Sequence, residues 1–145
     1  MKAYLDTSVL IAASLRDHRH HLQSFDLVKA VKDGSMNGFI STHGLAEFYA
    51  VITRIPVDPR VHPVEAGRLI DEDILRYFEL IALSGSDYKS VVRSTASAGL
   101  SGGVLYDALH LHAAQKAGCD RVYTHNVKDF RALAPANLIG KITAP

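Results

Sequence analysis

Three acidic side chains stand in surroundings that are otherwise apolar, and acids in such places can do chemistry. Asp6 follows a short apolar run, Glu47 lies within Leu-Ala-Glu-Phe, and Asp107 lies within Val-Leu-Tyr-Asp-Ala-Leu. A buried carboxylate without a partner costs free energy, and one divalent cation bound to all three would remove that cost. Mg²⁺ and Mn²⁺ prefer carboxylate oxygens and often bridge to a substrate phosphate. The three acids therefore predict a site for Mg²⁺ or Mn²⁺.

Each acid, taken singly, also has an ordinary structural explanation. Asp6 and Asp107 could cap helix N-termini, and Glu47 could lie on a solvated helix face. Capping does not explain Glu47, however, because the helical pattern around it is otherwise apolar. The metal site is the interpretation that accounts for all three acids together.

Alternating strand and helix patterns indicate which elements position these acids. Apolar runs predict strands at residues 2–5, 38–41, 78–83, 120–124 and 138–143. Apolar residues at helical spacing predict helices at 9–15, 22–31, 43–55, 64–77, 104–117 and 126–133, and a further helix capped by Ser86 and ending near residue 98. This alternation predicts an α/β fold, a single domain of residues 1–145 with a central parallel sheet flanked by helices on both faces.

Ligands of such sheets bind beyond the carboxyl ends of the strands. Asp6 directly follows the first predicted strand, and Thr124 and Asn126 end or follow the fourth. Glu47 and Asp107 lie in the early turns of two predicted helices. We therefore expect these residues, distant in sequence, to gather at one edge of the sheet.

Composition excludes several other classes of protein. The chain has 145 residues, 48% of them hydrophobic, which excludes a disordered chain. Sixteen Lys and Arg against fifteen Asp and Glu leave a net charge of +1, which excludes a strongly basic nucleic-acid binder. A single cysteine excludes a disulfide framework and a thiolate-rich zinc site. Without a recognisable leader or an apolar run of membrane-spanning length, we expect a cytoplasmic protein with no membrane partner.

Four segments resemble, in order, the motifs of PIN-domain ribonucleases, especially VapC-type toxins. They are the segments Tyr-Leu-Asp-Thr-Ser-Val-Leu-Ile from residue 4, Leu-Ala-Glu-Phe from 45, Gly-Gly-Val-Leu-Tyr-Asp-Ala-Leu-His from 102, and Thr-His-Asn-Val-Lys-Asp-Phe from 124. Short strings of this kind are common singly. Four in the family's order, on the expected elements and over nearly the whole chain, are a specific signal.

The resemblance implies roles for particular residues. Asp6, Glu47 and Asp107 fall on the family's metal-binding acids, and Asn126 falls on a fourth catalytic position where many members carry Asp. Asn can still bind a metal through its amide oxygen, with one less negative charge. Asp129 could supply that charge instead, although its Lys-Asp-Phe context fits a surface turn better.

Further expectations come from the same resemblance. Ser8 and Thr124 match hydroxyl positions that hydrogen-bond the metal-binding acids and orient them. A cation held by the acids would activate water for RNA hydrolysis, leaving a 5′-phosphate and a 3′-hydroxyl. The implied partners are an RNA substrate such as tRNA or rRNA, a small antitoxin that covers the acidic pocket, and a second copy of the chain, with the apolar stretches between residues 64 and 92 as an interface.

Other interpretations stay open at this point. A catalytically decayed PIN fold could serve as an RNA-binding or protein-interaction module, although three intact acids argue against it. His18, His20 and His21 could form a zinc site, a solvated loop or, with nearby arginines, an RNA path. No Lys or His is assigned as a general base. A phosphoacceptor domain is excluded because it needs an acidic pair after the first strand, whereas Asp6 is followed by Thr7 and Ser8. A D-x-D phosphatase is excluded because position 8 is Ser.

Overall fold

A five-stranded parallel sheet forms the centre of the protein in the computed structural model, which describes residues 1–145. The strand order is β3-β2-β1-β4-β5, and every neighbouring pair is parallel. The strands are β1 (Lys2–Leu5), β2 (Asn37–Ser41), β3 (Glu79–Ile81), β4 (Arg121–Tyr123) and β5 (Ile142–Thr143). The predicted parallel sheet is therefore confirmed.

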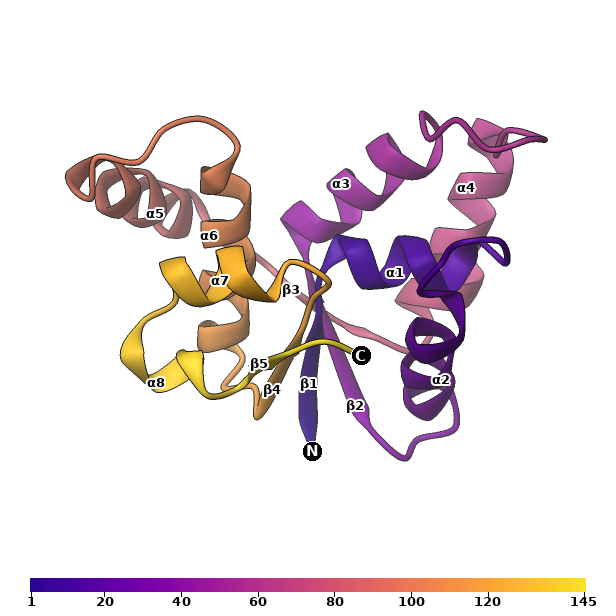
Figure 1. The fold of residues 1–145 in the computed structure, drawn as a ribbon, viewed down its shortest axis with the longest axis horizontal. Coiled ribbons are helices and arrows are strands. Elements are labelled where there is room, and N and C mark those ends of the chain that lie inside the picture. Colours follow the sequence, from indigo (N-terminus) through magenta and orange to yellow (C-terminus); the bar gives the residue numbers. More distant parts are fainter.

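Helices cover both faces of this sheet, as predicted. Figure 1 shows α1 to α4 on one side of the strands and α5 to α8 on the other. The helices are α1 (Thr7–Ser14), α2 (His21–Lys32), α3 (Thr42–Ile52), α4 (Pro63–Leu69), the π-helix η1 (Ile70–Leu75), α5 (Gly85–Ser97), α6 (Val104–Lys116), α7 (Val127–Leu133) and α8 (Ala136–Ile139). None of them combines the length and apolar character needed to cross a bilayer.

Each face of the sheet has its own hydrophobic core, because side chains along a strand point alternately to opposite faces. Ala3 and Leu5 of the central strand β1 pack with Phe48 and Ile52 under α1 to α4. Tyr4, between them in sequence, packs into the other core with residues from α6, α7 and α8. β1 is thus buried on both sides and fixes the position of the residue that follows it.

Several predicted boundaries are wrong: the helix predicted at 43–55 ends at Ile52, and the strand predicted at 78–83 is only Glu79–Ile81. Three further errors have a local cause. The helix predicted at 64–77 is α4 followed by η1, where the backbone widens into π-helical turns that end at Leu75. The helix expected after Ser86 begins after Ser84, because Ser84 and Asp87 form a reciprocal capping box. The last strand is only Ile142–Thr143, since Pro135 starts the short helix α8 that takes up Leu138.

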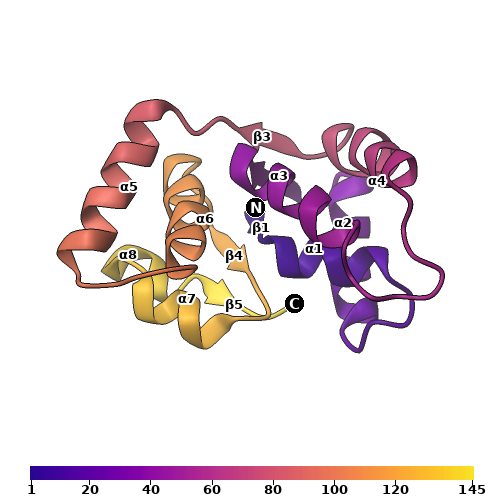
Figure 2. The ribbon, with the colours of Figure 1, turned by 90° about the horizontal axis from the view of Figure 1, so that it is seen from above.

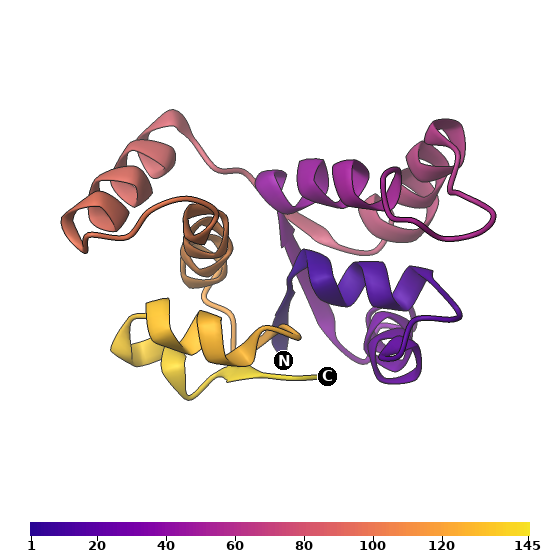
Figure 3. The same cartoon turned by 45° about the horizontal axis from the view of Figure 1, so that its top comes forward.

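The carboxyl ends of the strands meet at one edge of the sheet, where α1, α3 and α7 begin (Figures 1 and 3). β1 lies between β2 and β4, so the turns that leave these three strands are neighbours. The backbone N–H of Asp6 donates to the carbonyl of Tyr123 at 3.1 Å, which brings the end of β1 against the end of β4. This edge is where polar side chains from distant parts of the sequence can meet.

Candidate active site

Asp6 is held in a fixed orientation at the end of β1. It is 3% exposed and caps α1, with its Oδ1 accepting from the backbone N–H of Val9 at 3.2 Å. The hydroxyl of Ser8 donates to the same oxygen at 2.5 Å, and the hydroxyl of Thr124 donates to Oδ2 at 2.7 Å. The capping interpretation thus holds for Asp6, but the same carboxylate also reaches the cavity described next.

Asp6, Glu47, Asp107 and Asn126 all line one cavity of about 330 Å³. They come from the end of β1, from α3, from the first turn of α6 and from the residue before α7. The cavity is completed by Thr7, Ser8, Ile11, His18, Arg19, His20, Val51 and His125. Asp107 does not cap its helix, because Gly103 is the N-cap of α6.

The turn from β4 to α7 is tied to the turn from β1 to α1. Thr124 Oγ1 accepts from the backbone N–H of Asn126 at 2.9 Å, and Ser8 Oγ accepts from the backbone N–H of His125 at 3.1 Å. These bonds hold Asn126 at the cavity. Asp129, the alternative to Asn126, is exposed and is absent from the cavity wall.

Two histidines lie against Glu47, which sequence analysis did not anticipate. Nε2 of His43 is 3.0 Å from one carboxylate oxygen of Glu47, and Nε2 of His110 is 3.4 Å from the other. His110 is 2% exposed, and its Nδ1 shares a 2.7 Å hydrogen bond with the hydroxyl of Tyr4. The spacing of His43 and Glu47, four residues apart on one helix, could have indicated the first contact. Nothing in the sequence indicates the second, which needs α3 to pack on α6.

The acids of the cavity differ in how easily they hold a charge. Burial opposes the charged form of Glu47, but hydrogen bonds from His110 and His43 outweigh it and hold the pKa of Glu47 well below its usual range. Burial raises the pKa of Asp107, and the negative charges of Asp6 and Glu47 add to this against the opposing effect of His110. A nearby cation would therefore favour the charged form of Asp107.

The histidines predicted as one cluster separate in the structure. His20 stacks on His125 with ring centroids 4.4 Å apart, and His18 lies 5.9 Å from His20. His21 lies elsewhere, with Nδ1 3.0 Å from the carbonyl of Ala12. A zinc site made of His18, His20 and His21 is therefore wrong, and His18 and His20 instead join His125 at the rim of the acidic cavity.

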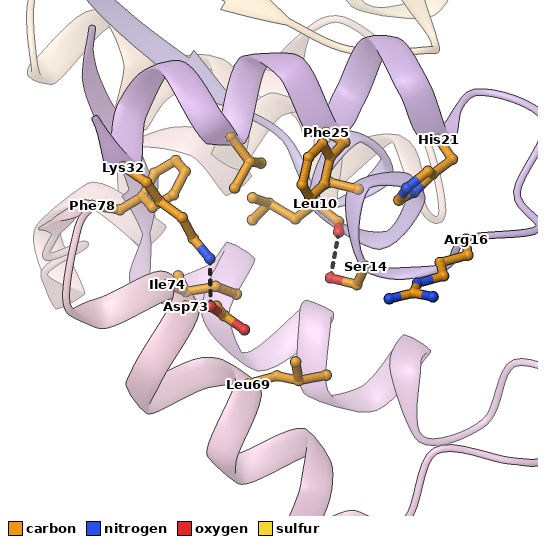
Figure 4. Close-up of a pocket in the computed structure, with 12 residues that line it drawn as sticks. Leu10, Ser14, Arg16, His21, Phe25, Lys32, Leu69, Asp73, Ile74 and Phe78 are labelled. Atoms are coloured by element: carbon orange, nitrogen blue, oxygen red, sulfur yellow. Dashed lines mark hydrogen bonds and ion pairs between the residues drawn. The ribbon is translucent and has the colours of Figure 1, made fainter. Parts of the chain in front are cut away.

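A second cavity, of about 430 Å³, has a different character (Figure 4). It lies among α1, α2, α4 and η1, and most of its lining is apolar, with Leu10, Phe25 and Phe78 among it. Lys32 and Asp73 form an ion pair across it. With a single acid that is already paired, this cavity lacks the groups needed for metal-assisted chemistry.

The donors of the acidic cavity fit a hard divalent cation. Asp6, Glu47 and Asp107 offer carboxylate oxygens, Asn126 offers an amide oxygen, and such oxygens are the ligands of Mg²⁺ and Mn²⁺. Thr7 lines the same cavity, and its hydroxyl is among the groups that lower the pKa of Glu47 and so favour a charged ligand there.

The family is established by comparison with known proteins. The family model described as PIN domain matches residues 3–134. The chain is 36% identical over 105 residues to ribonuclease VapC27 of Mycobacterium tuberculosis, covering 72% of this chain and 71% of that protein. It is 29% identical over 128 residues to ribonuclease VapC40 of the same species, covering 88% and 87%. The chain belongs to the PIN-domain family, and the resemblance drawn from the four motifs is confirmed.

Solved structures agree on the fold. VapBC2 from Rickettsia felis, bound to a DNA fragment from its promoter, gives a TM-score of 0.67 at 20% identity, over 100% of this chain and 99% of that chain. VapC20 from M. tuberculosis, a sarcin–ricin loop cleaving toxin, gives 0.69 at 16% identity, over 90% and 93%. The PIN-like arrangement of sheet and helices predicted from the sequence is therefore confirmed.

Proposed function

We propose that this protein is a metal-dependent endoribonuclease and the toxin of a VapBC-type toxin–antitoxin pair. The observation that carries the proposal is the meeting of Asp6, Glu47, Asp107 and Asn126 at one cavity. The family membership and the ribonuclease names of the relatives support RNA as the substrate. In this proposal residues 1–145 form one PIN domain that acts in the cytoplasm.

Each residue of the site has a distinct task in this proposal. Ser8 and Thr124 occupy the outer lone pairs of Asp6 and fix its orientation. His43 and His110 favour the charged form of Glu47, while the charged form of Asp107 is opposed by burial and would be favoured by a cation. Mg²⁺ or Mn²⁺, when bound, supplies Lewis-acid stabilisation of the phosphodiester and lowers the pKa of water. Asn126 contributes a neutral oxygen to the same site.

The rim of the cavity suits a nucleic-acid strand. Arg19 is exposed at the rim and can pair with a phosphate, while His18, His20 and His125 offer ring faces to unstacked bases. The small net charge of +1 favours weak, shape-dependent binding over tight nonspecific binding. We propose a structured RNA such as tRNA or rRNA as the substrate.

A second candidate function is a non-catalytic module that binds RNA or protein through the same fold. The observation in its favour is Asn126, a neutral residue where many PIN domains carry an acid. The remaining acids weigh against it, because a binding module gains nothing from keeping a costly group such as Asp107 half-buried. Metal-dependent cleavage distinguishes the two functions.

The proposed protein partners are a small antitoxin that covers the acidic cavity and a second copy of this chain. A solved VapBC2 complex supports the first. For the second, the edge strand β3 lies between α4 and α5 along one side of the molecule (Figure 2). The segment that runs from α4 through β3 to α5 carries the exposed apolar residues Val64, Leu75, Tyr77, Leu80, Tyr88 and Val92. Light scattering of the wild type and of Leu80→Lys tests the dimer, which this charge should dissociate.

The decisive experiment compares wild type, Asp6→Asn and the exposed control Asp26→Asn on purified tRNA and rRNA. Wild type and Asp26→Asn should cleave with Mg²⁺ or Mn²⁺, leave 5′-phosphate ends and stop in chelator. Asp6→Asn should be inert, and its expression should not slow bacterial growth. Wild-type protein that neither cleaves RNA in Mn²⁺ nor affects growth would refute the nuclease and leave the binding module.

A further inference from the structure

Glu47 belongs to two sets of donors at once. Glu47 lines the acidic cavity, and its two carboxylate oxygens also contact the imidazoles of His43 and His110. Ligand atoms of these three residues all lie within 4.8 Å of one another. They come from α3 and α6, two helices that pack together. The set consists of two nitrogens and one carboxylate, which differs in chemistry from the all-oxygen cavity beside it.

The spacing of these donors is close to the edge lengths of a tetrahedral zinc site. Donors bound to Zn²⁺ at about 2.0–2.2 Å lie about 3.3–3.6 Å apart. The two contacts of Glu47, 3.0 Å to His43 and 3.4 Å to His110, are close to that range. The two contacts go to different oxygens of Glu47, and all the donor atoms lie within 4.8 Å of one another, so one ion can lie between the carboxylate and both imidazoles.

The ring of His110 is also oriented as that of a metal ligand usually is, and the ring of His43 is held by stacking. A metal-binding histidine typically uses its second ring nitrogen in a hydrogen bond that fixes the ring. His110 does so through Nδ1 and the hydroxyl of Tyr4, which in turn donates to Ser41 Oγ at 2.9 Å. His43 stacks on Tyr106 with ring centroids 5.1 Å apart. Both Nε2 atoms are thereby directed at Glu47.

We propose that His43, Glu47 and His110 form a Zn²⁺ site whose occupation inhibits the nuclease. Imidazole nitrogens select Zn²⁺ over Mg²⁺, and two histidines with one carboxylate are an established zinc donor set. A Zn²⁺ ion bound to Glu47 would neutralise the carboxylate and turn it toward the two imidazoles. Zinc should therefore withdraw one ligand from the Mg²⁺ or Mn²⁺ site. Binding of zinc stands on the geometry alone, whereas inhibition also rests on the proposed function.

Zinc binding is measured by titrating the whole chain against a chromogenic zinc chelator, in wild type, His43→Gln and His112→Gln. His112 lies on the same helix as His110 but pairs with Asp87, at 2.9 Å, so it serves as the matched control. Wild type and His112→Gln should bind one Zn²⁺ with equal affinity. His43→Gln should bind at least about 10-fold more weakly, since it removes one of three ligands. Circular dichroism checks that each variant is folded.

Two results would overturn the site. Zinc affinity that is the same in wild type and His43→Gln would show that His43 is not a ligand. Loss of affinity in His20→Gln with none in His43→Gln would assign zinc to the histidines at the cavity rim. His110→Gln and Glu47→Gln, if folded, should weaken zinc binding as His43→Gln does.

The inhibitory effect is read from RNA cleavage at a fixed Mg²⁺ concentration with increasing Zn²⁺. Each variant is compared with its own zinc-free rate, and the zinc needed for half inhibition should rise at least about 10-fold in His43→Gln and stay unchanged in His112→Gln. Equal sensitivity of wild type and His43→Gln would overturn the coupling. A wild type that binds zinc through His43 but never cleaves RNA would refute the nuclease and leave the zinc site standing.

Discussion

The two sides of the acidic cavity hold their carboxylates by different means. Asp6 is oriented by two hydroxyls and a backbone N–H, from Ser8, Thr124 and Val9. Glu47 is held by two imidazoles, from His43 and His110. Hydroxyls and amides orient an anion without adding a nitrogen ligand, so the Asp6 side of the cavity keeps the oxygen donors that hard cations prefer. Imidazoles also lower the pKa of the acid and can themselves bind a metal.

Asp107 is held in neither of these two ways, and its pKa shifts in the opposite direction to that of Glu47. Its pKa is raised by burial and by the other acids, with His110 the charge that opposes this. The cavity therefore has one carboxylate in a fixed orientation, Asp6, and one whose charged form is favoured by imidazoles, Glu47. The third, Asp107, has a charged form that burial opposes and that a bound cation would favour.

The largest effect is expected from Asp6→Asn. The amide keeps a capping oxygen for Val9 but removes the negative charge from the most rigidly held ligand. Cleavage should fall by about 1000-fold or more, whereas Tm should change by only a few degrees. Single-turnover cleavage and thermal unfolding measure the two quantities. An active Asp6→Asn would mean that the hydroxyl-held side of the cavity is structural only.

Asp107→Asn should lower cleavage by about 100-fold and at the same time stabilise the protein. Since the folded state raises the pKa of Asp107, this group favours folding only while protonated, and that contribution is lost as pH rises through the raised pKa. At pH 7 without divalent cation its charge is a cost that Asn removes. We expect a Tm roughly 2–4 °C above wild type.

The pH dependence of the Tm increase in Asp107→Asn shows whether the increase has an electrostatic cause. Below the ordinary carboxyl pKa of about 3.9, wild-type Asp107 is protonated like its amide counterpart, so the two Tm values should converge. The exposed control Asp26→Asn should show no gain at pH 7. A gain that persists at low pH would mean that Asn improves packing, not electrostatics, and would weaken the contrast between Asp107 and the other acids.

The sequence predicted the strand ends well because they are local features. An acid after an apolar strand, or a Thr two residues before Asn126, is visible without knowing the fold. The family motifs then indicated the roles of Glu47, Asp107 and Asn126 in the site. The parallel sheet then needed only the alternation of elements. Boundaries failed where a nearby group competed, as Ser84 did with Ser86 through its reciprocal bond with Asp87.

The histidine side of the cavity could not be predicted in the same way. His110 is 63 residues from Glu47, and the contact arises because α6 packs against α3 under a buried Tyr4. An alternating or helical pattern shows only that His110 faces inward. What it meets there depends on tertiary packing, as does the pairing of His20 with His125 in place of His21.

A smaller effect is expected from removing the hydroxyls behind Asp6. Ser8→Ala and Thr124→Val each leave one Asp6 oxygen without its hydroxyl donor, so the carboxylate should be less well oriented for a cation. Apparent Mg²⁺ affinity should fall about 10-fold, and cleavage should recover at high Mg²⁺. Thr42→Val, at a hydroxyl that bonds the N–H of Leu83, is the matched control. Loss that Mg²⁺ does not rescue would point to misfolding of the turn.

The smallest effect is expected at Asn126, the one neutral member of the site. Asn126→Ala should lower cleavage by only about 5-fold, less than Asp107→Asn, because it removes an oxygen but no charge. Asn126→Asp should tighten Mn²⁺ binding by about 3- to 10-fold, since it adds a charge to a site that prefers carboxylates. The fold should be kept, because this residue precedes α7 without a side-chain capping bond and a negative charge suits a helix start. Calorimetry with Mn²⁺ measures the gain, with Asp129→Asn, at the exposed acid outside the cavity wall, as the control. If Asn126→Ala and Asp107→Asn lose equal activity, or if Asp129→Asn weakens Mn²⁺ binding, the fourth ligand has been misassigned and Asp129 becomes the better candidate.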